Sequence, residues 1–220
     1  MAFNYSPKII TDGLVLCLDA ANTKSYPGSG TVWSDLSRGG NNGTLTNGPT
    51  FNSANGGSIV FDGVNDTAIL PNRSDLSAGT GNFTYSSWIY PLSYGFYAPL
   101  FVTSITNGML IGKNGNNFVL RAFNVTDLLQ FSTLPSLNVW TNITITRIGT
   151  STTLYYNSIP QTTATVSHNF IQASTYIASD GLPTAWYNGR ISSTCFYKGV
   201  GLTTSQVLQN YNATKSRFGL

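Results

Sequence analysis

The stretch Phe83-Thr84-Tyr85-Ser86-Ser87-Trp88-Ile89-Tyr90-Pro91 decides the fold of this chain. It is the longest run of aromatic and β-prone residues in the sequence. Side chains alternate across a strand, so Phe83, Tyr85 and Ile89 share one face while Trp88 and Tyr90 share the other. Because both faces carry bulky apolar groups, we predict a central strand that is covered on both sides.

The composition indicates one globular domain that spans residues 1–220. Hydrophobic residues make up 41% of the chain and aromatic residues 13%, which is enough for a sizeable core. Charged residues make up only 9%, against about 25% in an average soluble protein. Asn, Thr, Ser and Gly must therefore supply most of the polar surface, as is typical of proteins that work outside the cytosol or in large assemblies.

Charge and hydropathy argue against nucleic acid and membrane as partners. The net charge of +3 is scattered along the chain, and the nearest approach to a basic cluster is 215–217. Nucleic-acid binding calls for a concentrated basic stripe. Asp12 and Asp19 flank the short apolar run at 14–18, so the first 20 residues do not resemble a signal peptide. No run approaches the roughly 20 apolar residues of a membrane span.

Alternating residues and turn signals predict an all-β chain with one helix at its end. We expect Leu14, Leu16 and Leu18 to face the core, and likewise Ile143 and Ile145. The segment 202–213 changes to helical spacing, with Thr203 or Thr204 as N-cap. Two stacked antiparallel sheets are the expected architecture, built from strands at 13–20, 44–46, 58–61, 67–70, 83–91, 99–103, 109–112, 118–123, 128–131, 140–147, 152–156, 175–178 and 189–198.

The two cysteines, Cys17 and Cys195, lie on the first and last long strands that we predict. Such strands are often neighbours in a sandwich, so a disulfide between them is geometrically feasible. Two free thiols are the alternative, because two cysteines make no disulfide framework.

Several landmarks together resemble the laminin G-like branch of the concanavalin A-like lectin/glucanase superfamily. The matching stretches occur in the family's order and include Ser58-Ile59-Val60-Phe61-Asp62-Gly63, Thr153-Leu154-Tyr155-Tyr156-Asn157 and Gly189-Arg190-Ile191. The resemblance implies a jelly-roll sandwich. The sequence from Tyr5-Ser6-Pro7 onward and that of 210–220 are similar to the corresponding segments of laminin G-like domains in virion proteins of tailed phages.

The residues do not point to an enzyme. Some relatives in this superfamily hydrolyse glycans with paired glutamates, and this chain contains no glutamate. A glycosidase uses two carboxylates about 5 to 10 Å apart, whereas Asp62 and Asp66 fall in a predicted loop. The only histidine, His168, has no second His or Cys near it in sequence that would indicate a metal cluster or a triad. We therefore expect no catalytic residues.

Calcium is the one cofactor that the resemblance suggests, because laminin G-like domains often hold a structural calcium at the sandwich rim. The loop Asp62-Gly63-Val64-Asn65-Asp66 offers two carboxylates and an amide oxygen from Asn65, which are ligands that calcium prefers. The alternative is that Asp62 and Asn65 cap the turn by hydrogen bonds to the backbone.

Carbohydrate binding calls for exposed aromatic rings next to amide and hydroxyl groups. Tyr94, Phe96 and Tyr97 follow the central strand in a loop, and Trp186 and Tyr187 precede the last strand. Either cluster is a candidate ligand-binding surface. The alternative is that these aromatics pack onto the core or lie in a subunit contact.

We predict a non-enzymatic structural protein of the virion surface, either a capsid decoration protein or a tail or fibre module. Its expected partners are the major capsid protein, tail components or further copies of itself. The alternative is an adhesin that binds a glycan of the host surface.

Overall fold

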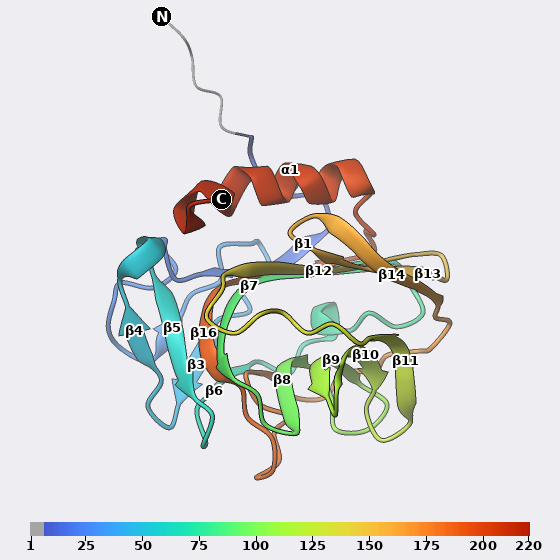
Figure 1. The fold of residues 1–220 in the computed structure, drawn as a ribbon, viewed down its shortest axis with the longest axis horizontal. Coiled ribbons are helices and arrows are strands. Elements are labelled where there is room, and N and C mark those ends of the chain that lie inside the picture. Colours follow the sequence, from blue (N-terminus) through green and yellow to red (C-terminus); the bar gives the residue numbers. More distant parts are fainter. Residues whose placement is uncertain (1–6) are drawn as a thin grey trace, which may run out of the picture.

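The computed structural model describes residues 7–220, which form two stacked antiparallel sheets with one α-helix outside them (Figure 1). Tyr5 and Ser6, which contribute to the resemblance to phage virion proteins, lie outside these residues. The helical segments of the described chain are α1 (Thr204–Thr214) and the single turns η1 (Ala54–Gly56), η2 (Ser74–Leu76) and η3 (Lys215–Phe218). The predicted all-β sandwich with a short C-terminal helix is confirmed.

Sheet A is the sheet beneath the helix, in the order β14-β13-β12-β7-β16-β5-β4, with β1 also paired to β16. The long strand β16 pairs with β5 through its first residues and with β1 through its last. The strands of sheet A are β1 (Leu14–Asp19), β4 (Thr50–Asn52), β5 (Ser58–Asp62), β7 (Phe83–Ser93), β12 (Thr141–Ile148), β13 (Ser151–Tyr156), β14 (Ile159–Thr165) and β16 (Asn188–Lys198).

Sheet B lies on the other side of the core and has the order β11-β10-β9-β8-β15-β6-β3-β2. Its outer face is not covered by the α-helix (Figure 1). The strands of sheet B are β2 (Val32–Trp33), β3 (Gly43–Thr46), β6 (Thr67–Leu70), β8 (Tyr97–Val102), β9 (Met109–Asn114), β10 (Asn117–Ala122), β11 (Thr126–Phe131) and β15 (Thr175–Ile177).

The strand β7 is central, as predicted, between β12 and β16. Phe83, Tyr85 and Ile89 are buried in the core between the sheets. On the opposite face Trp88 lies beneath the C-terminal segment, where its indole N–H donates to Thr214 Oγ1 at 2.9 Å. Aromatic rings therefore fill both faces of β7, because one face meets sheet B and the other meets the helix.

Helix α1 begins with the capping interaction that its sequence predicts. The Thr203 hydroxyl accepts the N–H of Gln206, and the Gln206 side chain accepts the N–H of Thr203 at 2.9 Å. This pair of bonds satisfies backbone groups that have no partner in the first turn. Val207 is the buried residue of the helix and packs against Tyr197 of sheet A.

The inward orientation of the strands is confirmed for Ile143 and Ile145, which are fully buried. It is wrong for Leu14. The register of β1 against β16 shifts between Leu14 and Leu16, so Leu16 continues into the core while Leu14 packs beneath the helix near Tyr197. A β-bulge of this kind turns the following side chains to the other face of the strand.

Three short or polar strands, β2, β4 and β14, were not predicted from the sequence. β2 and β4 have two and three residues, which is too few to show a period. β14 is an edge strand of sheet A with mostly polar, partly exposed residues, so it has no apolar alternation. Because partner strands and not their own residues hold these segments extended, the sequence pattern alone does not reveal them.

The guanidinium of Arg147 is fully buried at the end of β12. It donates hydrogen bonds to the carbonyl oxygens of Gly79, Gly81 and His168, and it lies 5.0 Å from the ring centroid of Phe83. Burial lowers the pKa of this guanidinium. Arg147 therefore ties the loop before β7 and the segment around His168 to sheet A.

No helix in residues 7–220 is long and apolar enough to cross a membrane.

Candidate ligand-binding site on the outer face of sheet B

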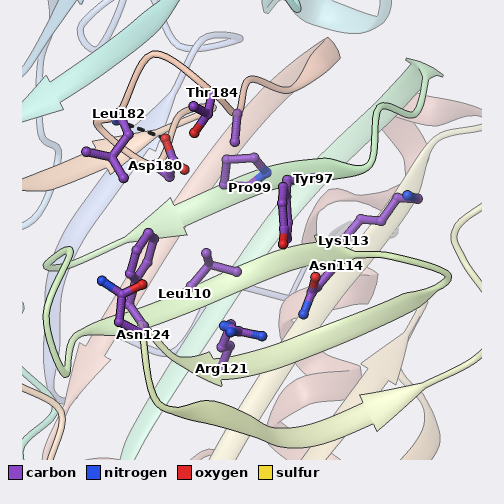
Figure 2. Close-up of a pocket in the computed structure, with 12 residues that line it drawn as sticks. Tyr97, Pro99, Leu110, Lys113, Asn114, Arg121, Asn124, Asp180, Leu182 and Thr184 are labelled. Carbon is purple, nitrogen blue, oxygen red and sulfur yellow. Dashed lines mark hydrogen bonds between the residues drawn. The ribbon is translucent and has the colours of Figure 1, made fainter.

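A cavity of about 190 Å³ opens on the outer face of sheet B, where β8, β9 and β10 meet the loop before β16 (Figure 2). We call it the Tyr97 pocket. Its walls come from three neighbouring strands and one crossing loop. The lining residues are Tyr97, Pro99, Leu110, Lys113, Asn114, Arg121, Phe123, Asn124, Asp180, Leu182, Thr184 and Ala185.

The floor of the pocket is apolar. Leu110 and Phe123 pack with Val102 and Val119 in a small cluster that is separate from the main core. The alternation along β9 explains this, because Met109 and Ile111 enter the main core while Leu110, between them, faces outward.

An exposed tyrosine ring stands at one side of the pocket. Tyr97 is 44% exposed and the adjacent Phe96 is 68% exposed, and their rings lie nearly perpendicular with centroids 4.7 Å apart. The ammonium of Lys113 donates to the carbonyl oxygens of Gly95, at 2.6 Å, and Phe96, at 3.1 Å. Lys113 thereby fixes the chain that carries the two rings, and its burial lowers the pKa of its ammonium group.

A hydrogen-bonded polar group lies next to Tyr97 on the neighbouring strands, since Asn114 is the ladder partner of Tyr97. Arg121 Nη1 lies 2.7 Å from Asp127 Oδ1, and the Asn114 amide donates to the same carboxylate at 2.9 and 3.1 Å. The two charged residues are direct partners in the β10–β11 ladder. Because Asp127 orients both donors, the Arg121 and Asn114 side chains are held in place beside the pocket.

Asp180 closes the pocket from the loop between β15 and β16. Its carboxylate accepts the N–H of Leu182 at 2.9 Å (Figure 2). Burial raises the pKa of this carboxyl. Gly181, at φ 79°, permits the turn, because a Cβ there would lie 2.5 Å from the ring of Tyr176.

The predicted aromatic residues have different locations. Tyr97 lines the pocket and Phe96 lies exposed beside it. Tyr94 is half-buried against the core and donates its hydroxyl to the carbonyl of Pro135 at 2.9 Å. Trp186 is partly buried and pairs with Ser179 in a β-bridge that shapes the Asp180 loop.

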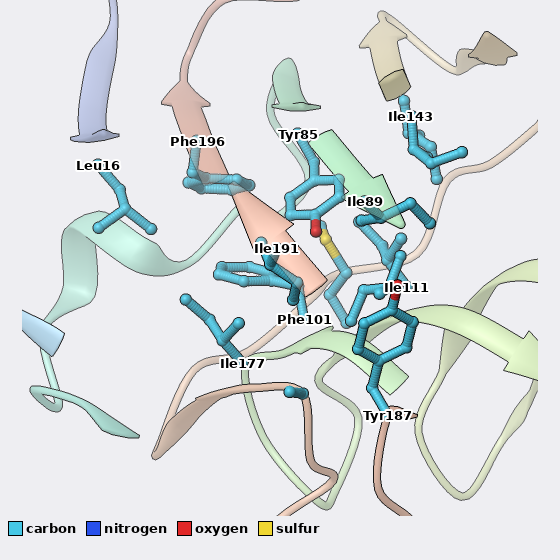
Figure 3. Packing of buried hydrophobic residues seen from close by; sticks show 14 of the residues in the cluster. Leu16, Tyr85, Ile89, Phe101, Ile111, Ile143, Ile177, Tyr187, Ile191 and Phe196 are labelled. Atoms are coloured by element: carbon cyan, nitrogen blue, oxygen red, sulfur yellow. The ribbon is translucent and has the colours of Figure 1, made fainter. Parts of the chain in front are cut away.

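Tyr187 is 1% exposed and lies in the main core, so the prediction that it offers a surface for a ligand is wrong (Figure 3). Its neighbours in the core come from both sheets, and burial raises the pKa of its hydroxyl well above the ordinary value.

The predicted calcium loop shows the hydrogen bonds of a capped turn. Asp62 Oδ1 accepts the N–H of Val64 at 2.8 Å and that of Asn65 at 3.4 Å. Asp66 is buried, and its Oδ2 accepts the N–H of Asp62 at 3.0 Å. Burial raises the pKa of Asp66, and the nearby charge of Asp62 adds to this. Each carboxylate therefore already accepts backbone donors of the same loop. The capping alternative holds for Asp62, while Asp66 and not Asn65 supplies the second acceptor.

Among residues 7–220, no three His, Cys, Asp or Glu side chains lie close enough together to hold a metal ion. His168 Nε2 lies 3.3 Å from the carbonyl oxygen of Asn107 and its ring packs against Phe170. This location is away from the Tyr97 pocket residues.

The polar wall of the pocket is the part of the site that the sequence did not reveal. Asn114, Arg121 and Asp127 lie on three strands and meet only through strand pairing. The sequence contained one signal. Only residues 124–127 separate the predicted strands 118–123 and 128–131, and asparagine tolerates the positive φ that Asn124 adopts in this turn, 59°. A hairpin at this turn would have placed Arg121 near Asp127.

The fold and the pocket together define a class of protein, an antiparallel β-sandwich with a small recess on the outer face of one sheet. A family model described as the concanavalin A-like lectin/glucanases superfamily matches residues 62–207. The chain belongs to this superfamily. The predicted membership is confirmed. A comparison with curated protein sequences finds no match.

Several solved structures share the fold. Domain 4 of AbnA, an extracellular arabinanase from Geobacillus stearothermophilus, was solved in complex with arabinotriose. It is 18% identical over 92% of this chain and 100% of its own, with a TM-score of 0.72. The binding domain of Paraclostridial Mosquitocidal Protein 1 has 18% identity, covers 91% of this chain and 52% of its own, and has a TM-score of 0.72.

The botulinum neurotoxin serotype D binding domain is 16% identical over 92% of this chain and 51% of its own, with a TM-score of 0.70. The chain thus spans about half the length of these two toxin domains. At such identities the likeness establishes the fold.

Proposed function

We propose that this chain is a carbohydrate-binding module that holds a neutral oligosaccharide in the Tyr97 pocket. The observation that carries the proposal is the exposed ring of Tyr97 beside a wall of oriented polar groups. Sugar rings present apolar faces to aromatic side chains and hydroxyls to amides, guanidinium groups and carboxylates. The superfamily membership and the arabinotriose-bound relative support the same class of ligand.

The charges at the pocket favour a neutral sugar over an acidic one. Arg121 is paired with Asp127, and the Lys113 ammonium is bound by two backbone carbonyl oxygens. Asp180 has no basic partner within salt-bridge distance in the described chain. A sugar carboxylate would therefore meet the Asp180 carboxylate without an unpaired cation to receive it, whereas a hydroxyl can donate to Asp180.

We propose binding without hydrolysis. The chain has no glutamate, and the Asp127 carboxylate already accepts hydrogen bonds from Arg121 and Asn114, so it serves to orient these two donors. Incubation of a bound oligosaccharide with the protein is expected to release no new reducing ends.

The test is a glycan array followed by calorimetric titration of the best neutral ligand, with arabinotriose as the first defined probe. We expect the wild type to bind neutral sugars more tightly than uronic or sialic acids. We expect Tyr97→Ala to lose the binding of neutral sugars. The proposal is overturned by an array without neutral binders, or by binding that Tyr97→Ala leaves unchanged.

We propose the surface of a tailed-phage virion as the setting in which this module works, as a capsid decoration, tail or fibre protein. The similarity of residues 210–220 to virion proteins and the 9% content of charged residues support this proposal. Mass spectrometry of purified particles tests it. Copies near the number of capsid subunits are expected for decoration and a few copies for a tail position, while absence from the particles contradicts it.

A further inference from the structure

The two cysteines face each other across neighbouring strands beneath the helix. Cys17 of β1 and Cys195 of β16 are direct partners in the antiparallel ladder, and their sulfur atoms lie 3.1 Å apart. Both are free thiols in this structure. The pair is outside the Tyr97 pocket, so it has no part in the proposed binding site.

The backbone hydrogen bonds identify which kind of ladder position the two cysteines occupy. The N–H of Cys17 donates to Asp35 Oδ1 at 2.8 Å, and its carbonyl accepts the N–H of Leu36 at 2.8 Å. Neither group points to β16, so Cys17 and Cys195 form a non-hydrogen-bonded pair. In such a pair the Cα atoms are about 4.5 Å apart and the side chains approach closely. That separation is within the range that a disulfide spans.

The sulfur atoms lie beside a cleft, although Cys17 itself is buried. Cys17 and Cys195 both line a cleft of about 530 Å³ between the segment 7–9 and the end of the C-terminal helix. The cleft also borders Asp19 and Arg217, which form an ion pair of 2.8 Å. The thiols are therefore near the surface and still held in one geometry by the sheet.

We propose that Cys17 and Cys195 form a disulfide in oxidising surroundings, and that this bond fastens the first strand of the chain to the last. With a small-molecule disulfide such as oxidised glutathione as oxidant, one protein thiolate attacks it and releases one glutathione thiolate. The second protein thiolate then attacks the mixed disulfide and releases the other. The two cysteines lose two electrons, the oxidant's S–S bond gains them, and the two protons of the cysteines balance the two thiols formed.

The cross-link would stabilise the fold because it joins residues that are 178 positions apart. A disulfide that closes a long loop removes many conformations from the unfolded chain. We expect the melting temperature to rise by about 5–15 °C on oxidation. The bond between the thiols and their burial raise the pKa of Cys195, so the reaction is expected to quicken as the pH rises above neutral.

The test treats the full chain with oxidised glutathione or with a reductant, then measures intact mass, free thiols and melting temperature. The chain has no other cysteine, so the readout is unambiguous. The expected product has lost two hydrogen atoms, has no free thiol, yields a peptide that links Cys17 to Cys195 and melts at the higher temperature.

Cys17→Ser and Cys195→Ser are matched controls, because serine is close to cysteine in size. Each is expected to gain one glutathione and to show no rise in melting temperature. Two glutathione adducts on the wild type, or two thiols that still titrate after oxidation, overturn the proposal. A cross-link without a rise in melting temperature overturns the stabilising role.

Discussion

Phe218 stacks on Trp88 with ring centroids 4.1 Å apart, although 130 residues separate them in the chain. Trp140, which directly precedes β12, joins them at 4.6 Å from Phe218. This aromatic cluster covers the outer face of sheet A and explains why the central strand carries large residues on both sides. The C-terminal segment is thus part of the fold's packing and not an appendage.

Phe218→Ala should destabilise the protein by about 2–4 kcal/mol, because it leaves a cavity over Trp88. Urea denaturation measures the change in the free energy of unfolding, and hydrogen exchange should show faster exchange in α1. Leu220→Ala is the control, since Leu220 is 49% exposed and its truncation should have little effect. Equal stability of Phe218→Ala and wild type would refute this account of the C-terminal segment.

Arg147→Met should cost about 3 kcal/mol of unfolding free energy. The change keeps an apolar stem but removes the bonds to three carbonyl oxygens and the contact with the Phe83 ring. Denaturation in urea provides the measurement. Arg190→Met is a useful comparison because Arg190 also lies over an aromatic ring, at 5.1 Å from Tyr90, but its Nε has no hydrogen-bond partner. If Arg190→Met lost more unfolding free energy than Arg147→Met, the stabilising role of the Arg147 hydrogen bonds would be contradicted.

Tyr97→Ala should weaken neutral oligosaccharide binding roughly tenfold or more, because stacking on a sugar and the area it buries are lost. Phe96→Ala tests whether the ring outside the pocket matters, and we expect a smaller loss. Calorimetric titration gives both dissociation constants. Neither change should lower the melting temperature by more than a few degrees, since both rings are substantially exposed. A larger loss of affinity in Phe96→Ala than in Tyr97→Ala would show that the sugar binds outside the pocket.

Asp180→Asn should separate stability from binding. Burial raises the pKa of Asp180, so the folded state binds more protons than the unfolded state between the two pKa values. Stability therefore falls as the pH rises from about 4 through the folded-state pKa. The amide removes this penalty and can still accept the Leu182 N–H.

We accordingly expect Asp180→Asn to be at least as stable as wild type at pH 7, with the advantage gone near pH 3. Binding of the neutral sugar should be weaker, because a carboxylate is the better acceptor for sugar hydroxyls. Urea denaturation at the two pH values and calorimetry provide the measurements. A variant that is less stable at pH 7 but binds as well as wild type would contradict both assignments.

Asp62→Ala should destabilise the loop after β5 by about 1 kcal/mol, because it removes the acceptor for the Val64 N–H. We expect calcium to give no heat of binding and a chelator to leave the melting temperature unchanged. Asn65→Ala is the control, with a smaller effect, since the loop's two cap acceptors are the carboxylates of Asp62 and Asp66. Calcium-dependent melting that disappears in Asp62→Ala would instead establish the metal site.

The sequence by itself determined the layers of the sandwich. Alternation in Phe83–Ser93 and Thr141–Ile148, together with the Thr203 cap, is a local property of the chain and identified the central strands and the helix. It also indicated one part of the candidate site, the exposed Tyr97. These features could be predicted because burial selects residues at every second position of a strand.

Only the tertiary structure decided which side chains meet. The bulge that turns Leu14 away from the core, the burial of Tyr187 and the group of Arg121, Asn114 and Asp127 depend on the register between strands. The same is true of the two sulfur atoms, which the ladder brings together across 178 positions. Register is set by packing over the whole sheet. A strand that shifted by one residue against its neighbour would turn all its inward side chains outward. The candidate binding surface therefore depends on how strands β8 to β11 pair and on where the Asp180 loop lies, which the pattern along any one strand does not specify.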